Sequence, residues 1–220
     1  MITEALSLKL IAGPAVLCAV AVLALVVSDL KGLRAGRYLF KPLAASAFIW
    51  VALSLDATTT AYGSWMLAAL ALCMLGDVFL MFDTERSFLA GLGAFLCGHL
   101  LFAVAFCQLP TNFMGLAASA LPAMLLLAGL RRWLAPHVPP AMKIPVALYV
   151  AVITLMLLCA GLTVDHPAAV FIIGGAWGFA ISDLAVARRQ FINPSRINGL
   201  WGTPLYFGSQ MVLACSIAFA

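Results

Sequence analysis

The chain has 220 residues, of which 65% are hydrophobic and 9% are charged, and its mean hydropathy is +1.12. A soluble domain carries about 25% charged residues, so this composition excludes a chain that covers its surface with water-facing side chains. The formal charge of +4 does not indicate nucleic acid as a partner, because the basic residues lie in short segments between apolar runs.

Eight apolar runs follow one another, each close to the length of about 20 helical residues that a bilayer core requires. We place the spans at 8–28, 40–56, 63–82, 88–109, 112–130, 144–164, 167–187 and 200–220. Backbone groups in lipid must be bonded internally, and the strict alternation of a transmembrane barrel is absent from the sequence, so these runs predict helices. We therefore expect an all-α, polytopic transmembrane helix bundle of about eight spans, forming one integral membrane domain over residues 1–220.

The first apolar run, residues 8–27, is expected to be a span and not a cleavable signal sequence. Residues 1–7 contain no basic side chain. The run is also longer than the about 7–15 apolar residues at the centre of a signal sequence.

The basic residues predict the orientation of the bundle. Of the 12 Lys and Arg residues, only Lys9 lies away from the connections that follow the first, third, fifth and seventh spans. Because Lys and Arg concentrate on the cytoplasmic side of membrane proteins, we expect these four connections to face the cytoplasm. Both termini would then be non-cytoplasmic, and a bacterial inner membrane is the expected location.

The third and seventh spans share a short pattern around an aspartate. Residues 75–80 read Leu-Gly-Asp-Val-Phe-Leu, and residues 181–186 read Ile-Ser-Asp-Leu-Ala-Val. Two four-span halves would have the same orientation, as a parallel repeat requires. Because the pattern is short, a four-plus-four internal repeat and two unrelated halves both remain open.

Asp77 and Asp183 are the acidic residues that lie well inside predicted spans. Charges within a membrane are costly and commonly serve a function. Both positions lie about 6–8 Å inside the expected cytoplasmic end of their span, at 1.5 Å per residue. Each follows a small residue, Gly76 or Ser182, which permits close helix approach. The alternative is that each acid pairs with a nearby Lys or Arg and has no further role.

Lys41 and His99 are candidates for the same site. Lys41 precedes Pro42 at the start of the second span, where proline suits a first helical turn. Lys41 would anchor the span, hold one acid ionised or bind a lipid phosphate. His99 lies near the middle of the fourth span, on a face that also carries Phe95 and Phe102, and it is either a packed hydrogen-bonding residue or part of the site.

Hydroxyl and amide side chains complete the expected substrate-binding set. They are Tyr149, Ser182, Tyr206 and Gln210. Such groups donate hydrogen bonds to a lipid headgroup or a catalytic carboxylate, and they can equally hold helices together.

No metal and no organic cofactor is expected. The other histidines, His137 and His166, lie in connections on opposite sides of the membrane, so three histidines cannot converge on a zinc ion. The six cysteines lie in or at the ends of apolar runs and include no Cys-x-x-Cys pair.

Taken in order, these motifs resemble the YhhN-like family of membrane lysoplasmalogenases. The matching elements are Lys41-Pro42, residues 75–80, Phe88…Gly91…Phe95…His99, Pro145…Tyr149…Met156, Ser182-Asp183 followed by Ala185 and Phe191, and Tyr206…Gln210. The resemblance extends over nearly the whole chain from the second span onward. One departure is Phe102, at a position where many members would be expected to carry Tyr.

The resemblance implies hydrolysis of the vinyl ether bond of lysoplasmalogens, which yields a fatty aldehyde and glycerophosphoethanolamine or glycerophosphocholine. The partners would be a lysophospholipid and membrane lipid, with the oligomeric state left open. Protonation of the vinyl ether β-carbon gives an oxocarbenium ion, and glycosidases handle a similar ion with two carboxyl groups. We expect Asp77 and Asp183 to form such a pair near the cytoplasmic leaflet, in either assignment, with Lys41 receiving the phosphate.

Two other classes of function remain as alternatives. Intramembrane aspartates also serve as proton relays, so Asp77 and Asp183 could belong to a small transporter or proton-coupled channel. Transporter sites lie near the midplane, whereas both acids are expected near one face. The third class is a structural protein whose acids pair across helices.

Overall fold

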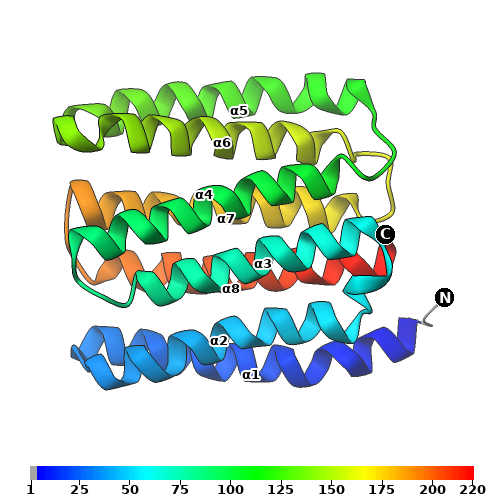
Figure 1. Cartoon of the computed structure of the whole chain (residues 1–220), viewed down its shortest axis with the longest axis horizontal. Helices are drawn as coiled ribbons and strands as arrows, with labels where there is room; N and C mark the ends of the chain where they lie inside the picture. Colours follow the sequence, from blue (N-terminus) through cyan, green and yellow to red (C-terminus); the bar gives the residue numbers. More distant parts are fainter. Residues whose placement is uncertain (1–3) are drawn as a thin grey trace.

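The computed structural model describes residues 4–220 as a bundle of eight α-helices, and residues 1–3 of the N-terminal stretch considered above lie outside this range. The helices are α1 (Glu4–Lys31), α2 (Arg34–Ser54), α3 (Ala61–Phe79), α4 (Glu85–Phe106), α5 (Phe113–Leu134), α6 (Lys143–Gly161), α7 (Ala169–Phe191) and α8 (Ile197–Cys215). They lie side by side and alternate in direction (Figure 1). The described range contains no strand, so the all-α prediction is confirmed.

Six of the helices, α1 and α3–α7, are long and apolar enough to cross a membrane. Helices α2 and α8 have similar lengths but are more polar. Helix α2 carries Arg34, Arg37 and Lys41, and α8 carries Asn198 and Gln210. Both pack within the same bundle as the apolar six (Figure 1). The chain is thus a helical bundle of an integral membrane protein, while membrane crossing by α2 and α8 and the orientation of the termini stay predictions.

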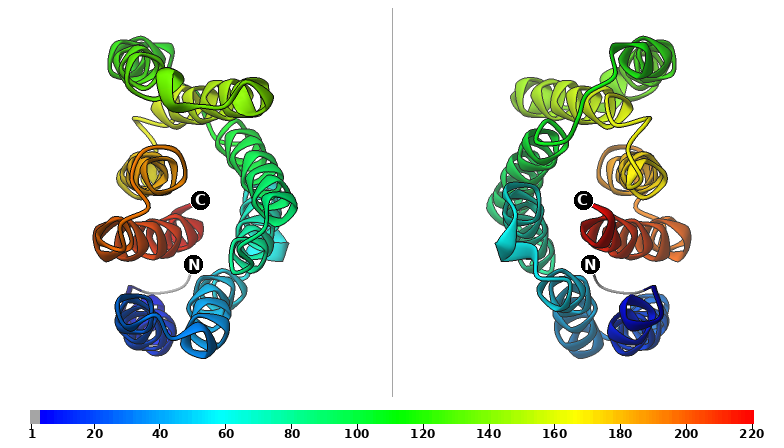
Figure 2. Two further views of the ribbon diagram at one scale, coloured as in Figure 1. Left: turned by 90° about the vertical axis from the view of Figure 1, so that its left-hand side faces the viewer. Right: turned by 90° about the vertical axis from the view of Figure 1, so that its right-hand side faces the viewer.

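Four helical hairpins build the bundle. Figure 2 looks along the helices and shows the α3–α4 hairpin facing the α7–α8 hairpin, with α1–α2 and α5–α6 at the two ends. Contacts close a ring in the order α2, α3, α4, α6, α7 and α8, with α8 returning to α2. Helices α1 and α5 lie outside this ring. Each packs on the helix that follows it, and α1 also contacts α8.

The connections α1–α2, α3–α4, α5–α6 and α7–α8 lie together at one end of the bundle, the left in Figure 1. We call this the basic end, because almost all the Lys and Arg residues lie near it. The α5–α6 connection at this end contains two 3-10 turns, Ala135–His137 and Pro140–Met142. Val138 and Met142 of this connection form a small buried apolar cluster with Leu134, the last residue of α5.

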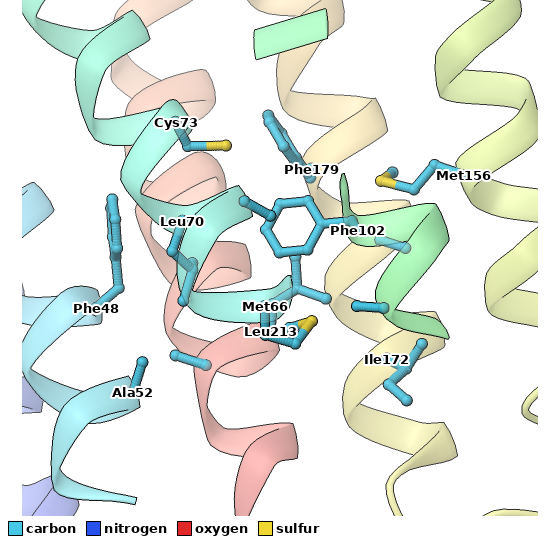
Figure 3. Close-up of a cluster of buried hydrophobic side chains, with 14 of the residues drawn as sticks. Phe48, Ala52, Met66, Leu70, Cys73, Phe102, Met156, Ile172, Phe179 and Leu213 are labelled. Atoms are coloured by element: carbon cyan, nitrogen blue, oxygen red, sulfur yellow. The ribbon is translucent and has the colours of Figure 1, made fainter. Parts of the chain in front are cut away.

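The core of the ring is filled by apolar side chains from several helices (Figure 3). Phe48, Phe102 and Phe179 come from α2, α4 and α7 and have no exposed surface. The Phe102 ring lies 6.2 Å from the Phe106 ring, centroid to centroid. Phe102, where the resemblance led us to expect Tyr, is thus part of the apolar core.

The expected position of Pro42 in a first helical turn is wrong. Helix α2 begins at Arg34, so Pro42 is its ninth residue. Because proline lacks an N–H, the carbonyl group of Tyr38 loses its helical partner. The difference arises because hydropathy marks where a helix leaves the lipid, whereas α2 continues through charged residues beyond that point.

Candidate active site

A cavity of about 750 Å³ lies among the helices at the basic end. We call it the main cavity. Six of the eight predicted site residues line it: Lys41, Asp77, Tyr149, Ser182, Asp183 and Tyr206. The fold therefore brings both intramembrane acids to one cavity, although they belong to helices on opposite sides of the ring.

Asp77 has a partner on each of its carboxyl oxygens. Lys41 Nζ lies 3.2 Å from Oδ1, and the Tyr206 hydroxyl donates to Oδ2 at 2.7 Å. The Asp77 side chain is only 4% exposed. A buried charge requires a partner of opposite charge and hydrogen bonds, and the structure supplies both.

Asp183 has one hydrogen-bond donor and one nearby imidazole. The Tyr149 hydroxyl donates to Oδ2 at 2.9 Å. The Nε2 atom of His99 lies 3.4 Å from the same oxygen, and the Asp183 side chain is 13% exposed. No Lys or Arg forms an ion pair with Asp183 among the described residues, so this acid lacks the fixed cation that Asp77 has.

The protonation of His99 follows from its backbone contact. Its Nδ1 atom lies 2.7 Å from the carbonyl oxygen of Phe95, and a carbonyl can only accept, so Nδ1 carries the hydrogen. A neutral His99 then presents a bare Nε2 atom to Asp183. This Nε2 atom is buried and has no hydrogen-bond partner among the described residues, although Asp183 Oδ2 lies 3.4 Å away.

Aromatic rings connect the surroundings of the two acids. The Phe179 ring lies 4.2 Å from the stacked His99 ring and 5.5 Å from the Tyr206 ring, centroid to centroid. The Tyr206 ring also makes an edge contact with Phe95 at 5.8 Å. This packing holds the imidazole and the phenol in fixed positions beside the cavity.

The contacts to the two acids follow one scheme. Asp77 of α3 is contacted from α2 and α8, by Lys41 and Tyr206. Asp183 of α7 is contacted from α6 and α4, by Tyr149 and His99. When the chain is divided into the halves α1–α4 and α5–α8, each acid contacts the second helix of its own half and the fourth helix of the other half. A four-plus-four repeat would have this arrangement, and the repeat itself stays a prediction.

The two acids lie at different distances from the ends of their helices. Helix α3 ends at Phe79, two residues after Asp77, whereas α7 continues to Phe191, eight residues after Asp183. The α7 extension past residue 187 is charged, and hydropathy could not count it as part of the helix.

The remaining predicted residues lie at the wall of the main cavity or behind it. The Ser182 hydroxyl donates to the Phe179 carbonyl oxygen on its own helix at 2.7 Å. His99 and Gln210 have no exposed surface and lie outside the cavity lining. Neither polar atom of the Gln210 side chain has a hydrogen-bond partner in the part of the chain that the structure describes.

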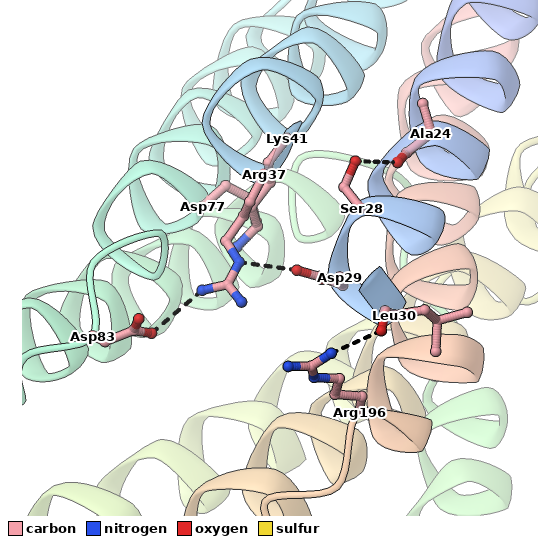
Figure 4. A network of polar contacts seen from close by, with 9 residues as sticks. All are labelled: Ala24, Ser28, Asp29, Leu30, Arg37, Lys41, Asp77, Asp83 and Arg196. Atoms are coloured by element: carbon pink, nitrogen blue, oxygen red, sulfur yellow. Dashed lines mark hydrogen bonds and ion pairs between the residues drawn. The ribbon is translucent and has the colours of Figure 1, made fainter. Parts of the chain in front are cut away.

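Sequence reasoning missed a charged group at the mouth of the main cavity. Arg37 Nε lies 2.9 Å from Asp29, and Arg37 Nη1 lies 3.3 Å from Asp83 (Figure 4). The Asp29 side chain is only 17% exposed. The sequence spacing could have indicated the Asp29–Arg37 pair, because each residue lies four positions from Leu33. Leu33 lies in the turn between α1 and α2, so the turn brings the two side chains together.

The cavity combines two carboxyl groups in different surroundings with a mainly apolar wall. One carboxyl is held by a cation, and the other accepts from a tyrosine hydroxyl and faces an imidazole nitrogen. This arrangement suits proton transfer to and from an amphipathic substrate. Within residues 4–220, no group of three or more His, Cys, Asp or Glu side chains is arranged to hold a metal ion.

The fold and the cavity define an integral membrane helix bundle with paired acids at one end. The chain belongs to the YhhN family, whose match covers residues 36–217. The resemblance stated from the sequence is thereby confirmed, and this family includes lysoplasmalogenases. No curated protein and no solved structure matches the chain.

Proposed function

We propose that the protein hydrolyses the vinyl ether bond of lysoplasmalogens, with its site facing the cytoplasmic leaflet of a bacterial inner membrane. The observation that carries the proposal is that Asp77 and Asp183 line one cavity in two different hydrogen-bonding states. Membership of a family that includes lysoplasmalogenases supports the choice of reaction.

The different partners suggest which acid does which task. Lys41 favours the ionised form of Asp77, because an opposite charge at about 4 Å or less stabilises a carboxylate. Asp183 has no Lys or Arg partner among the described residues and faces a bare imidazole nitrogen, so it is the better place for a proton. We assign Asp183 as the general acid and Asp77 as the carboxylate that stabilises the cation and accepts a proton from water.

The proposed reaction has three steps. Asp183 transfers its proton to the β-carbon of the vinyl ether, which produces an oxocarbenium ion and the Asp183 carboxylate. Water adds to the cationic carbon and gives a proton to Asp77, which forms a hemiacetal. In the collapse of the hemiacetal, Asp77 protonates the departing glycerol oxygen and Asp183 takes the hydroxyl proton, so aldehyde and alcohol leave and both acids return to their starting states.

The wall of the main cavity suits a lipid chain. Apolar side chains of several helices line it, including Leu80, Phe88, Leu92, Leu134 and Val146. A cavity of about 750 Å³ lies within the range of about 300–1,000 Å³ that small-molecule sites occupy. The alkenyl chain would lie against these residues, with the vinyl ether near the two acids.

The test uses two lysolipids that differ in one double bond. Purified protein is incubated with a vinyl-ether lysophosphoethanolamine and with its saturated alkyl-ether twin, and aldehyde is measured. Aldehyde from the first lipid alone is the expected result. Absence of aldehyde from both would overturn the proposal, and uptake of the lipid into liposomes without product would favour a transporter.

A further inference from the structure

A second, smaller cavity of about 240 Å³ lies at the basic end. We call it the arginine cleft. Four arginines and two aspartates contribute to its lining: Arg34, Arg37, Arg189, Arg196, Asp29 and Asp83. The formal charge of these six side chains is +2. Five lining residues also line the main cavity, Arg37 and Arg189 among them, so the cleft adjoins the mouth of the main cavity.

Two of the four arginines are engaged by the protein itself (Figure 4). Arg37 pairs with Asp29 and Asp83, as described above. Arg196 Nη1 donates to the Leu30 carbonyl oxygen at 2.8 Å. Its guanidinium also covers Gly32, which has a φ of 72° and where a Cβ would lie 3.0 Å from Arg196 Nη2. These two arginines stabilise the turn between α1 and α2.

The other two arginines have unused hydrogen-bonding capacity. Arg34 and Arg189 make no ion pair and no side-chain hydrogen bond with any residue in the described range 4–220. A guanidinium presents five N–H donors in a planar fork that matches the oxygens of a phosphate group. Two such forks on the wall of one small cleft form a site for a phosphoester anion.

The start of helix α2 adds positive potential to the cleft. Helix α2 begins at Arg34, and this start is not capped by a side chain and carries no acid in its first turn. Gly32, two residues before this start, lines the cleft. The free N–H groups and the dipole at a helix start favour an anion.

In this structure the ammonium group of Lys41 lies 3.2 Å from Asp77 Oδ1, so a phosphate would share it with that carboxylate. We propose that Arg34 and Arg189 bind the phosphoester group of an amphipathic ligand at the mouth of the main cavity. That this phosphoester is the headgroup of a lysophospholipid substrate rests on the proposed function. A free phosphoester in the water phase would have the same chemistry.

The experiment measures binding, so it does not depend on turnover. The full chain in detergent is titrated with the alkyl-ether lysophosphoethanolamine, which has no vinyl ether, and with the matching alkylglycerol, which has no phosphate. The variants are Arg34→Gln and Arg189→Gln. The control is Arg132→Gln, because Arg132 is exposed in the last turn of α5 at the same end and lines neither cavity.

Each of the two variants is expected to raise the Kd for the phosphate-containing lipid about tenfold, since a hydrogen bond to a charged group contributes about that factor. The Kd for the alkylglycerol and all values for Arg132→Gln should stay within about twofold of the wild type. Unchanged binding in both variants would overturn the site. An equal loss in Arg132→Gln, or an equal loss for the alkylglycerol, would also overturn it, because the effect would then be general.

Two further measurements separate the remaining possibilities. Glycerophosphoethanolamine is added as a competitor, and competition that needs Arg34 assigns the site to free phosphoesters as well as to lipid headgroups. Aldehyde release is followed on the same preparations. Binding that depends on the arginines, without aldehyde release, would support the phosphoester site and contradict the proposed hydrolase function. Aldehyde release with binding that does not depend on the arginines would support the hydrolase function and contradict the phosphoester site.

Discussion

The hydroxyl group of Tyr206 lies 2.7 Å from Oδ2 of Asp77, although 129 residues separate them in the sequence. The contact joins α8 to α3 across the ring, and the contact of His99 with Asp183 joins α4 to α7. Neither acid therefore has its full set of partners within its own half of the chain. The surroundings of both acids depend on the closed ring of six helices.

Replacing either acid by its amide should abolish aldehyde release. Asp77→Asn removes the carboxylate and Asp183→Asn removes the proton donor, and general acid–base groups contribute about 10²–10⁴-fold to rate. Both amides are close in shape to the acid, so both variants should fold, although Asp77→Asn leaves Lys41 without its anion and should melt at a lower temperature than the wild type. Asp165→Asn is the control, because Asp165 accepts a hydrogen bond from Asn112 away from the cavity. Near-full activity in either acid variant would contradict the paired mechanism.

The assignment of the proton can be tested by infrared spectroscopy of the carboxyl C=O stretch. The wild-type protein at neutral pH should show the band of a protonated buried carboxyl group. The band should persist in Asp77→Asn and disappear in Asp183→Asn. The opposite pattern would exchange the roles of the two acids.

Removing the lysine should destabilise the protein through the charge that it leaves behind. Lys41→Met leaves Asp77 buried without its cation, and breaking a buried pair costs about 3–5 kcal/mol. The double variant Lys41→Met/Asp77→Asn has no uncompensated charge and should recover at least about 1 kcal/mol of the free energy of unfolding. Unfolding in mixed micelles gives both values. A double variant no more stable than Lys41→Met would show that the pair is not coupled.

Removing the hydroxyl group of Tyr206 should lower activity, whereas removing that of Tyr62 should lower stability. Tyr206→Phe removes the donor to Asp77 and should lower the rate of aldehyde release about tenfold, the factor for a hydrogen bond to a charged group. Tyr62→Phe removes a buried contact with Ser216 that lies outside the cavity lining. It should lower the free energy of unfolding by about 1 kcal/mol with the rate unchanged. Equal rates in the two variants would exclude a catalytic part for Tyr206.

Two glycines of α5 should respond oppositely to alanine. A Cβ at Gly115 would lie 2.2 Å from the Gly161 carbonyl oxygen on α6, whereas a Cβ at Gly129 meets no atom within 4 Å. Gly115→Ala should therefore destabilise the α5–α6 hairpin, because the two backbones must separate. Gly129→Ala should stabilise the protein by up to about 1 kcal/mol through helix propensity. Melting temperatures of the two variants provide the comparison.

Hydropathy and the distribution of charge predicted the eight helices well, because both features report directly on which residues face lipid. Helix ends were predicted less well at the basic end. There α2 and α7 continue as helix through Arg37 and Arg188, residues that are too polar to count as part of a span.

The sequence also indicated that Asp77 and Asp183 share a site, because acids inside spans are rare enough to be noticed. It could not show that Lys41 and Tyr206 belong to Asp77 while His99 and Tyr149 belong to Asp183. That pairing depends on α4 packing against α6 and α8 against α2, and each apolar helix could pack equally well against several others.

The position of α8 in the ring has a consequence for biogenesis. This helix closes the ring against α2 and supplies Tyr206, and it emerges from the ribosome after the other seven helices. A nascent chain stopped before residue 197 lacks the Tyr206 hydroxyl for Asp77 and has no helix between α2 and α7 to close the ring. Closure of the ring is therefore expected to be a late step in assembly.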